Sequence, residues 1–595
     1  MFSKHILVVA LVVGAWSFLA TAQESDPLPA LETRVERLQA HIETVESIRA
    51  IKRLQYAYGH YVELGLWNDF ADLFADDAVT NYQAGVHGKA AIRQLFFAQV
   101  GQGKLGLSAG RIYPHILFQP VITLAPDGQT AKGRWRILAM LGGYGGSATW
   151  YSGVYENEYV LEDGVWKISV IHSEPKVTAA YTAAGWKDSG VHVPFHYTAA
   201  SVTTSVTTPI PASASRSAKV TSLADRVNQL ARRAARLNDQ AEVTNLQDTY
   251  GYAADRKLWD QVAGLFTQNG TLELGLQGVY VGKASIRHAL DQFGPKGPRD
   301  GELNDHIYLE TLVSVAPDGR TAMARGVELI MSGAPGGSSA PGGRNGELSE
   351  GVFENTFVKQ AATWKIQSVH FYPRMIVDAA AGWARSAKPA PGPSKQFPPD
   401  LPPTASYEIY PKFAVAPFHF DNPVTGKPPQ YPDGTPSSAE SAMARARPAA
   451  AAPSGTRLTP EAGLRDAERS LARAEAYDAA ENLIGAYSYY LDESPSDVAS
   501  LFVQPGRNTA SGSSIFVNQI LQPVIDVAPD ARSAKVRARL LNLGGTSGGA
   551  GYWAAGTFEG QIVSEQGAWK FQTARSSSTW SAPYPGGWAR TPTRF

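Results

Sequence analysis

The feature that most limits how this chain can fold is an internal repeat. The segment LQYAYGHYVELGLWNDFADLF at residues 54–74 recurs as LQDTYGYAADRKLWDQVAGLF at residues 246–266. A third version, IGAYSYYLDESPSDVASLF, begins at Ile484. Self-similarity on this scale is typical of tandem copies of one domain. Because 595 residues also require several domains, we expect three copies of one fold.

The similarity continues in register after these segments. HILFQPVITLAPDG at residues 115–128 matches HIYLETLVSVAPDG at 306–319 and NQILQPVIDVAPD at 518–530. Apolar residues three and four apart predict helices before Phe74, while the later stretches alternate or run apolar like strands. Helices followed by an antiparallel meander indicate an α+β class with helices on one face of a curved sheet.

Composition and repeat boundaries divide the chain as follows. We expect a signal peptide at 1–22, a first domain at 27–190, a linker at 191–220, a second domain at 221–385, a Pro/Ala-rich linker with a docking segment at 386–458, and a degenerate third domain at 459–595. In the longer linker, Pro417-Phe418-His419-Phe420 repeats Pro194-Phe195-His196-Tyr197 after the first copy. Such an aromatic segment is expected to lie extended across a domain surface.

The opening helices have heptad-like spacing. Leu31, Val35 and Leu38 show it in the first copy, and Leu223 and Val227 show it in the second. Two interpretations stay open from the sequence: each helix packs on its own domain, or the helices of different copies pair.

The ends and the composition limit the class of protein. Basic Lys4, the apolar run from Ile6 to Ala15 and the small residues Ala20-Thr21-Ala22 predict a cleavable export signal, and hence a periplasmic or secreted protein without a membrane segment after cleavage. The absence of cysteine excludes disulfides, thiolate metal sites and cysteine nucleophiles. Equal numbers of basic and acidic residues, 54 each, argue against a nucleic-acid partner. A small hydrophobic or aromatic ligand fits better.

These motifs together resemble one known family. An acid four residues before a tryptophan, a Gly-Lys-Ala segment at 88–90 and 282–284, a histidine-led strand with a Pro-Asp-Gly turn, and a final strand with Trp-Lys resemble the SnoaL-like family. This family belongs to the nuclear-transport-factor-2-like superfamily, which includes scytalone dehydratase, ketosteroid isomerase and polyketide cyclases. The resemblance implies three tandem cone-shaped α+β domains, each around an apolar pocket, working without metal or organic cofactor. It covers nearly all of the first two copies.

Scytalone dehydratase resembles the chain most in layout, because there an acid on the first long helix meets a strand histidine inside the cone. By position, Glu63 and Asp255 correspond to that acid, and His115 and His306 to that histidine. The dehydratase's second pocket histidine has no counterpart on the following strand. The second histidines of this chain are His172 and His370, on a later strand, which departs from the dehydratase pattern.

Acid–base chemistry explains why these residue types would matter. A histidine titrates near neutral pH, and a nearby carboxylate fixes its tautomer, so the pair can move protons. Tyr58 and Tyr250 are expected to hydrogen-bond a substrate oxygen as it gains charge. The structural alternatives are core tyrosines, solvated helix acids and structural histidines at strand starts. The expected substrate-binding residues are Trp67, Glu156, Asn157, Trp259, Glu354 and Asn355.

Two further histidines, and the third copy, differ from this pattern. His60 lacks a counterpart in the second copy and is predicted at the surface, while His419 is expected to be a packing residue. The third copy has Asn518 and Arg575 in place of the histidines, which removes the same acid–base chemistry. We therefore expect a cofactor-independent lyase or isomerase acting on a small aromatic or polycyclic hydroxy compound, without metal. The alternatives are a ligand-binding protein, or a scaffold in which the copies form an internal trimer, with further oligomerisation left open.

Overall fold

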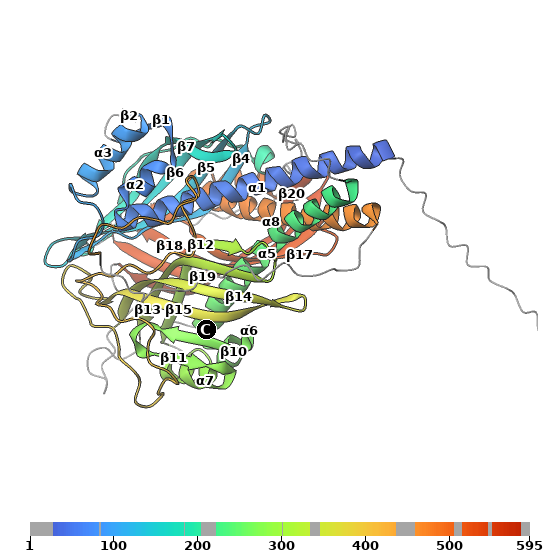
Figure 1. Cartoon of the computed structure of the whole chain (residues 1–595). Helices are drawn as coiled ribbons and strands as arrows, with labels where there is room; N and C mark the ends of the chain where they lie inside the picture. Colours follow the sequence, from blue (N-terminus) through green and yellow to red (C-terminus); the bar gives the residue numbers. More distant parts are fainter. Residues whose placement is uncertain are drawn as a thin grey trace, which may run out of the picture.

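A long helix followed by a mainly antiparallel sheet occurs three times along the chain (Figure 1). The computed structural model describes residues 28–82, 85–183, 185–203, 222–299, 301–333, 346–435, 459–504, 515–545 and 550–584. The expected signal segment lies outside these residues. We call the three helix-and-sheet parts unit 1, unit 2 and unit 3.

Unit 1 contains α1 (Leu28–Leu64), α2 (Trp67–Asp72), β1 (Phe74–Thr80), β2 (Val86–His87), α3 (Lys89–Gln99), β3 (Arg111–Ile112), β4 (His115–Leu124), β5 (Thr130–Gly143), β6 (Ala148–Glu162), β7 (Val165–Ile171), β8 (Ser173–Ala180) and β9 (Lys187–Asp188), followed by α4 (Ala199–Thr203). Unit 2 contains α5 (Leu223–Asp255), α6 (Trp259–Leu265), β10 (Phe266–Leu274), β11 (Val279–Val281), α7 (Gly282–Leu290), β12 (Leu303–Val315), β13 (Thr321–Gly333), β14 (Glu347–Gln360) and β15 (Thr363–Asp378). Unit 3 contains α8 (Pro460–Glu493), β16 (Ile515–Val517), β17 (Ile520–Val527), β18 (Ser533–Gly545), β19 (Gly551–Glu565) and β20 (Ala568–Pro583).

The sheets of units 1 and 2 share one strand order. In unit 2 it is β11-β10-β15-β14-β13-β12, and unit 1 follows the corresponding path. The first long strand pairs parallel with a late one, through Phe74 and Ile168 in unit 1 and Phe266 and Ile366 in unit 2. The sequence predicted the antiparallel meander but not this parallel pair, because a pairing between distant segments leaves no local pattern.

Each unit has a β-bulge a few residues after the histidine position, in β4, β12 and β17. Gln119, Glu310 and Gln522 have positive φ angles of 52°, 56° and 49°, and the strand register shifts beside each of them. A bulge bends its strand and redirects a side chain. The bulged residues face the helix of another unit, as a Cβ on Gly59 of α1 would collide with Glu310.

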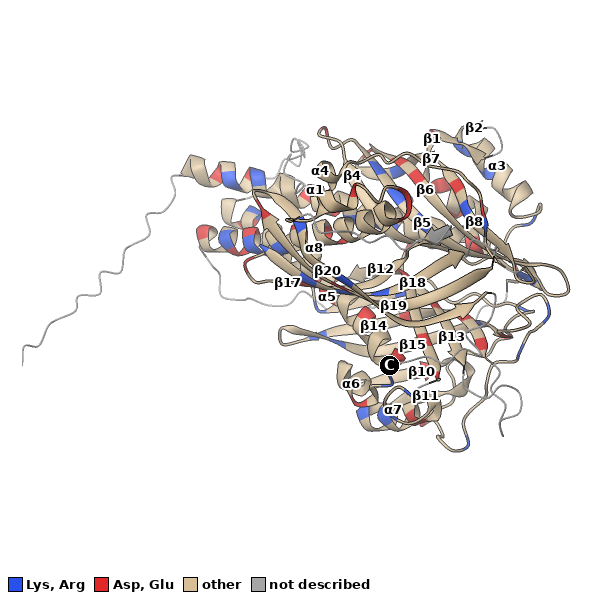
Figure 2. Ribbon diagram, turned by 180° about the vertical axis from the view of Figure 1, so that it is seen from behind, with Lys and Arg blue, Asp and Glu red and all other residues tan. Residues whose placement is uncertain are grey.

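The N-terminal halves of α1, α5 and α8 pack on one another. Leu31, Val35, Val227, Leu230 and Leu464 belong to one buried cluster from all three helices. Of the two interpretations of the heptad spacing, pairing between copies is therefore the one observed. Residues of both charges alternate along these helices (Figure 2).

A second shared core lies where the sheets meet. Trp150 of β6 packs edge-to-face against Trp383, which follows β15, at 5.2 Å, and against Trp553 of β19 at 5.4 Å. All three tryptophans are nearly fully buried. The central apolar core therefore belongs to the three units jointly.

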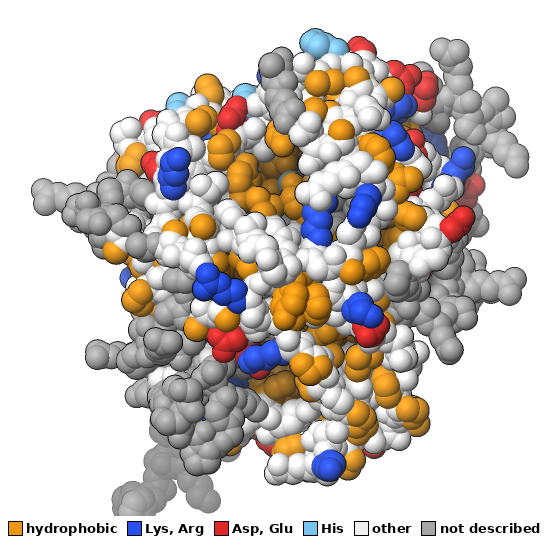
Figure 3. Space-filling view, turned by 90° about the vertical axis from the view of Figure 1, so that its left-hand side faces the viewer, with side chains coloured by type: hydrophobic (Ala, Val, Ile, Leu, Met, Phe, Trp, Pro, Cys, Tyr) orange, Lys and Arg blue, Asp and Glu red, His pale blue; other side chains and the backbone are white. Residues whose placement is uncertain are grey.

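No helix in the described ranges is both long enough and apolar enough to cross a bilayer. One face of the molecule shows hydrophobic side chains among scattered charges of both signs, and a hollow near its upper centre is lined by hydrophobic atoms (Figure 3).

Candidate active site

In unit 1 the predicted residues Tyr58 and His115 come together through a tyrosine that the sequence analysis missed. The Tyr155 hydroxyl lies 2.9 Å from Nε2 of His115 and 3.4 Å from the Tyr58 hydroxyl. The three side chains come from α1, β4 and β6 and are all buried. Tyr113 stacks on the His115 ring at 5.6 Å. Unit 1 therefore contains an aromatic cluster with one imidazole.

His115 is held neutral by its surroundings. Burial lowers its pKa to about 3, against a smaller opposing effect of Glu63. Its Nδ1 has no hydrogen-bond partner within the described part of the chain. A neutral imidazole can orient a ligand by hydrogen bonding, but this one is a weak base near neutral pH.

In unit 2 the corresponding histidine has a carboxylate partner. Nδ1 of His306 lies 2.7 Å from Oε1 of Glu328, and the Tyr308 hydroxyl donates to the same oxygen at 2.8 Å. Tyr308 and Glu328 are opposite each other on β12 and β13. The Tyr250 ring lies 5.9 Å from the Tyr308 ring. Unit 2 thus brings the predicted Tyr250 and His306 into one cluster.

This arrangement suits proton transfer. When Glu328 is ionised, it accepts from Nδ1–H, which fixes the ring and leaves Nε2 to take a proton. The imidazolium that forms is stabilised by the carboxylate. The His306 side chain keeps 16% of its surface exposed, whereas Glu328 keeps 5%. The imidazole of His306 is therefore partly accessible to solvent, whereas Glu328 is largely shielded from it.

Glu328 was missed, although the sequence carried a signal for it. It is the single acid in the strand segment RGVELIM, at a position where unit 1 has Ile137. A lone carboxylate in an apolar strand must find a partner when it is buried.

Glu63 does not occupy the place that the sequence analysis expected beside His115. Its carboxylate accepts two hydrogen bonds from Arg374 of β15, at 2.6 and 3.2 Å. Burial alone would raise the pKa of Glu63, but Arg374 and His60 outweigh it and lower the pKa to about 2. Glu63 is thus a permanent anion that joins unit 1 to unit 2.

The prediction that His60 lies at the surface is wrong, because its side chain is fully buried. Its Nδ1 lies 3.7 Å from both Glu63 and Glu310, and burial lowers its pKa to about 4.

Asp255 likewise joins two units. It pairs with Arg539 of β18, and its Oδ1 accepts from the backbone N–H of His306 at 2.5 Å rather than from the imidazole. The ring of His306 is instead hydrogen-bonded to Glu328. Asp492, the third acid in register, pairs with Arg136 of β5 at 2.7 Å. The three acids thus link unit 1 to 2, unit 2 to 3 and unit 3 to 1.

Glu156 and Glu354 lie against the linkers rather than beside His115 and His306. Glu156 pairs with Arg134 at 2.6 Å and with His196. Glu354 pairs with Arg325 and His419, both at 2.7 Å.

The neighbouring asparagines make hydrogen bonds within their own units. Asn157 donates to Gln55 of α1 at 3.0 Å, and Asn355 donates to Gln247 of α5 at 2.7 Å. Each thus ties its sheet to its long helix.

The remaining predicted residues are also placed outside the two clusters. Nε2 of His172 lies 3.2 Å from Glu174. His370 stacks on Tyr372 at 3.8 Å, and burial lowers its pKa to about 3.

Both predicted tryptophans are bound to nearby backbone. The indole N–H groups of Trp67 and Trp259 donate to the backbone carbonyls of Lys104 and Gly294 at 2.9 Å. Both indoles are buried and support the loops that follow α3 and α7.

Parts of the chain are similar to known proteins. The SnoaL-like domain family matches residues 43–172 and 235–370. Among solved structures, a protein from Novosphingobium aromaticivorans proposed to be a scytalone dehydratase is 20% identical over 25% of this chain and 98% of its own, with a TM-score of 0.22. A hexachlorocyclohexane dehydrochlorinase from Novosphingobium barchaimii is 19% identical over 26% of this chain and 98% of its own, with a TM-score of 0.21. No curated protein matches the chain.

Proposed function

We propose that the chain is a cofactor-independent lyase or isomerase whose reaction takes place in unit 2, in line with the match of residues 43–172 and 235–370 to the SnoaL-like domain family. The observation that carries the proposal is the hydrogen bond between His306 and Glu328, with Tyr308 on the same carboxylate. The substrate is a small aromatic or polycyclic hydroxy compound, which suits the aromatic surroundings.

The reaction follows from the roles of these groups. Nε2 of His306 takes a proton from a carbon next to a substrate carbonyl, and Glu328 stabilises the imidazolium. Burial keeps the pKa of Tyr250 and Tyr308 above the usual value, so both hydroxyls stay protonated. Tyr308 donates to Glu328, and Tyr250 is the neutral donor for a substrate oxygen. In a dehydration, the C–O bond breaks and the imidazolium returns its proton to the leaving hydroxyl as water. In an isomerisation, the proton returns to another carbon.

A second function, ligand binding without turnover, is favoured for unit 1. Its His115 is neutral near neutral pH and contacts Tyr155 rather than a carboxylate. Export to the periplasm or the medium remains part of the proposal and rests on residues 1–22 of the sequence.

The test compares matched variants on a panel of hydroxylated bicyclic ketones, with water loss followed by absorbance and deuterium uptake by mass spectrometry. His306→Gln is expected to lower kcat about 100-fold or more, the usual range for a lost general base. His115→Gln and Asn518→Ala serve as controls and are expected to stay within about tenfold of the parent. Full activity of His306→Gln, or loss of activity in a folded Asn518→Ala variant, would contradict the assignment.

A further inference from the structure

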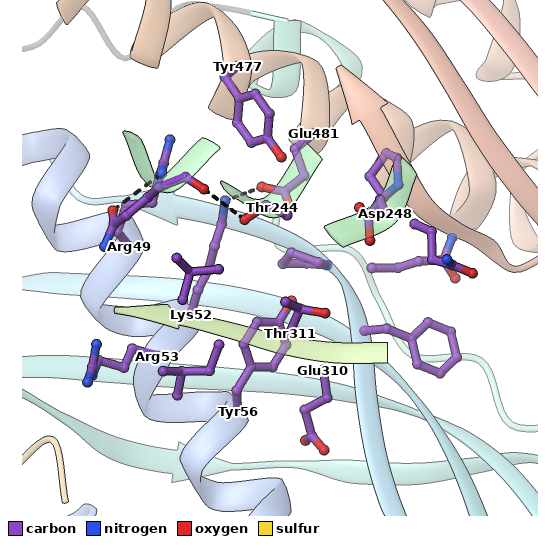
Figure 4. A pocket seen from close by; sticks show the side chains of 18 of the residues that line it. Arg49, Lys52, Arg53, Tyr56, Thr244, Asp248, Glu310, Thr311, Tyr477 and Glu481 are labelled. Atoms are coloured by element: carbon purple, nitrogen blue, oxygen red, sulfur yellow. Dashed lines mark hydrogen bonds and ion pairs between the residues drawn. The ribbon is translucent and has the colours of Figure 1, made fainter. Parts of the chain in front are cut away.

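A cavity of about 360 Å³ lies between the three long helices, and of the residues around His306 and Glu328 it shares Tyr308. Its walls come from α1, α5 and α8 and from the bulged stretches of β4, β12 and β17. In Figure 4, Lys52 of α1, Asp248 of α5 and Glu481 of α8 reach it from the three helices. We call it the axial cavity. Its volume falls within the range of small-molecule sites.

The walls combine aromatic and basic side chains. Tyr56, Tyr308, Tyr477 and Phe118 provide aromatic surface. The basic lining residues are Arg49, Lys52, Arg53, Arg233 and Arg236, and the acidic ones are Glu46, Asp248, Glu310 and Glu481.

Most of these charges already have partners. Arg49 and Lys52 pair with Asp478, Lys52 also pairs with Glu481, and Arg233 pairs with Glu46. Arg236 is different: within the described ranges it makes no ion pair and no side-chain hydrogen bond, although it is half-buried at the cavity. A half-buried guanidinium on a cavity wall favours an anion.

At the inner end, Asp248 is a buried polar group that lacks a partner. Only 3% of it is exposed, and its carboxyl makes no hydrogen bond with any described residue. Burial, reinforced by the nearby Glu481, raises its pKa well above the usual value. In its neutral form Asp248 can donate to an oxygen of a ligand. The pKa of Glu310 is likewise raised well above its usual value, first by burial and then by Glu63, so a basic lining dominates.

We propose that the axial cavity binds an aromatic carboxylic acid, with the carboxylate at Arg236, the ring between the tyrosines and the distal end toward Asp248. Arg236 and Asp248 are three or more helical turns apart on α5, about 18 Å along its axis, a span that the long arginine side chain shortens. Neither His306 nor Glu328 lines this cavity, although Tyr308 lies between the two sites, and the proposal does not depend on the proposed reaction. A cationic ligand is disfavoured because the basic side chains outnumber the ionised acids.

Isothermal titration calorimetry on the full chain at pH 7 tests this with three probes that share one ring system. 2-Naphthoate is expected to bind, 2-naphthamide to bind at least about tenfold more weakly, and 2-naphthylmethylamine to give no heat. Equal binding of the acid and the amide, preferential binding of the amine, or no heat from 2-naphthoate would overturn the proposal.

Matched variants locate the binding. Arg236→Ala is expected to weaken 2-naphthoate at least about tenfold, and Arg236→Lys less. The control is Arg232→Ala, an exposed residue one turn away on the same helix and outside the cavity, which is expected to leave affinity unchanged. His306→Gln is also expected to leave it unchanged, because that residue belongs to the other site. An equal loss in Arg232→Ala, or loss only in His306→Gln, would place the ligand elsewhere.

Discussion

Glu63 carries a buried negative charge, and the positive charge that balances it comes from a distant part of the chain. Arg374 contacts both Glu63 and Glu350, and burial lowers the pKa of this arginine less than the two carboxylates raise it. A buried ion pair of this kind adds little net stability compared with apolar packing, but breaking it leaves an uncompensated charge. The acid is therefore occupied by a structural role and is not available as the partner of His115.

Removing Arg374 should consequently be costly. Arg374→Met is expected to lower the free energy of unfolding by about 3–5 kcal/mol, because two buried carboxylates lose their counter-charge. Arg537→Met is the control, since the Arg537–Glu559 pair is more than half exposed on both sides; here the expected loss is below about 1 kcal/mol. Chemical denaturation measures both variants. Equal losses would show that the Arg374 pairs are as weak as a surface pair.

The buried His115 should make the free energy of unfolding depend on pH. Its pKa is about 3 in the folded chain and near 6.5 when unfolded. Between these values the unfolded chain binds a proton that the folded chain does not, so this group's stabilisation is present above pH 6.5 and is lost as pH falls toward 3. In His115→Gln, the slope of unfolding free energy against pH in this window should fall by up to about 1.4 kcal/mol per pH unit. Slopes that match the parent's throughout the window would contradict the assigned pKa.

The repeat extends beyond the helices and strands into the two linkers. The Phe195 ring lies under Arg134 at 4.4 Å, and the Phe418 ring lies under Arg325 at 3.9 Å. The carbonyl oxygens of Pro194 and Pro417 accept from the same two arginines. The two aromatic segments therefore dock in the same way on units 1 and 2, and each brings its histidine to the glutamate that pairs with the same arginine.

Phe418→Ala tests how firmly the longer linker is held. The ring also packs against Tyr61 and Phe420 but is only partly buried, so its removal is expected to cost about 1–3 kcal/mol of local stability. Limited proteolysis should then cut residues 407–431 faster than in the parent. Lys427→Ala changes an exposed residue in the same segment, and this variant should be cut at the parental rate. Unchanged cleavage of Phe418→Ala would show that the ring does not hold the segment.

These elements also show what the sequence alone could predict. Helix and strand stretches follow from periodicity, which is local. The repeat register pointed to Tyr58 and His115 in unit 1 and to Tyr250 and His306 in unit 2, and in unit 1 the two residues contact the same tyrosine hydroxyl. The partners of the acids were not predictable in this way. Glu63 and Arg374 are 311 positions apart, and nothing near either residue signals the other. Glu328 was visible as a lone strand acid, but its pairing needed the register of β12 against β13.

Over the whole molecule, three units share two apolar cores, one between the helices and one between the sheets. The acids at the helix ends join the units in a closed cycle, through Glu63, Asp255 and Asp492. A heterologous contact that closes on itself after three steps is the geometry of a cyclic trimer, here within one chain. Unit 3, which has Asn518 beside Asp492 at 2.6 Å, completes this cycle without the histidine of the other units.

Trp553→Ala tests whether this closed arrangement unfolds as one body. Trp553 contacts Trp150 and Trp186 of unit 1 while itself belonging to unit 3, so its loss opens a cavity in a core that the units share. We expect a loss of about 3–5 kcal/mol, seen as one shift of a single transition in both circular dichroism and tryptophan fluorescence. Tyr144→Ala is the control, because that ring is 52% exposed, and it should shift neither signal. If Trp553→Ala instead splits the unfolding curve, with only part of the amplitude moving to lower denaturant, unit 3 is an independent domain and the shared core does not couple it to units 1 and 2.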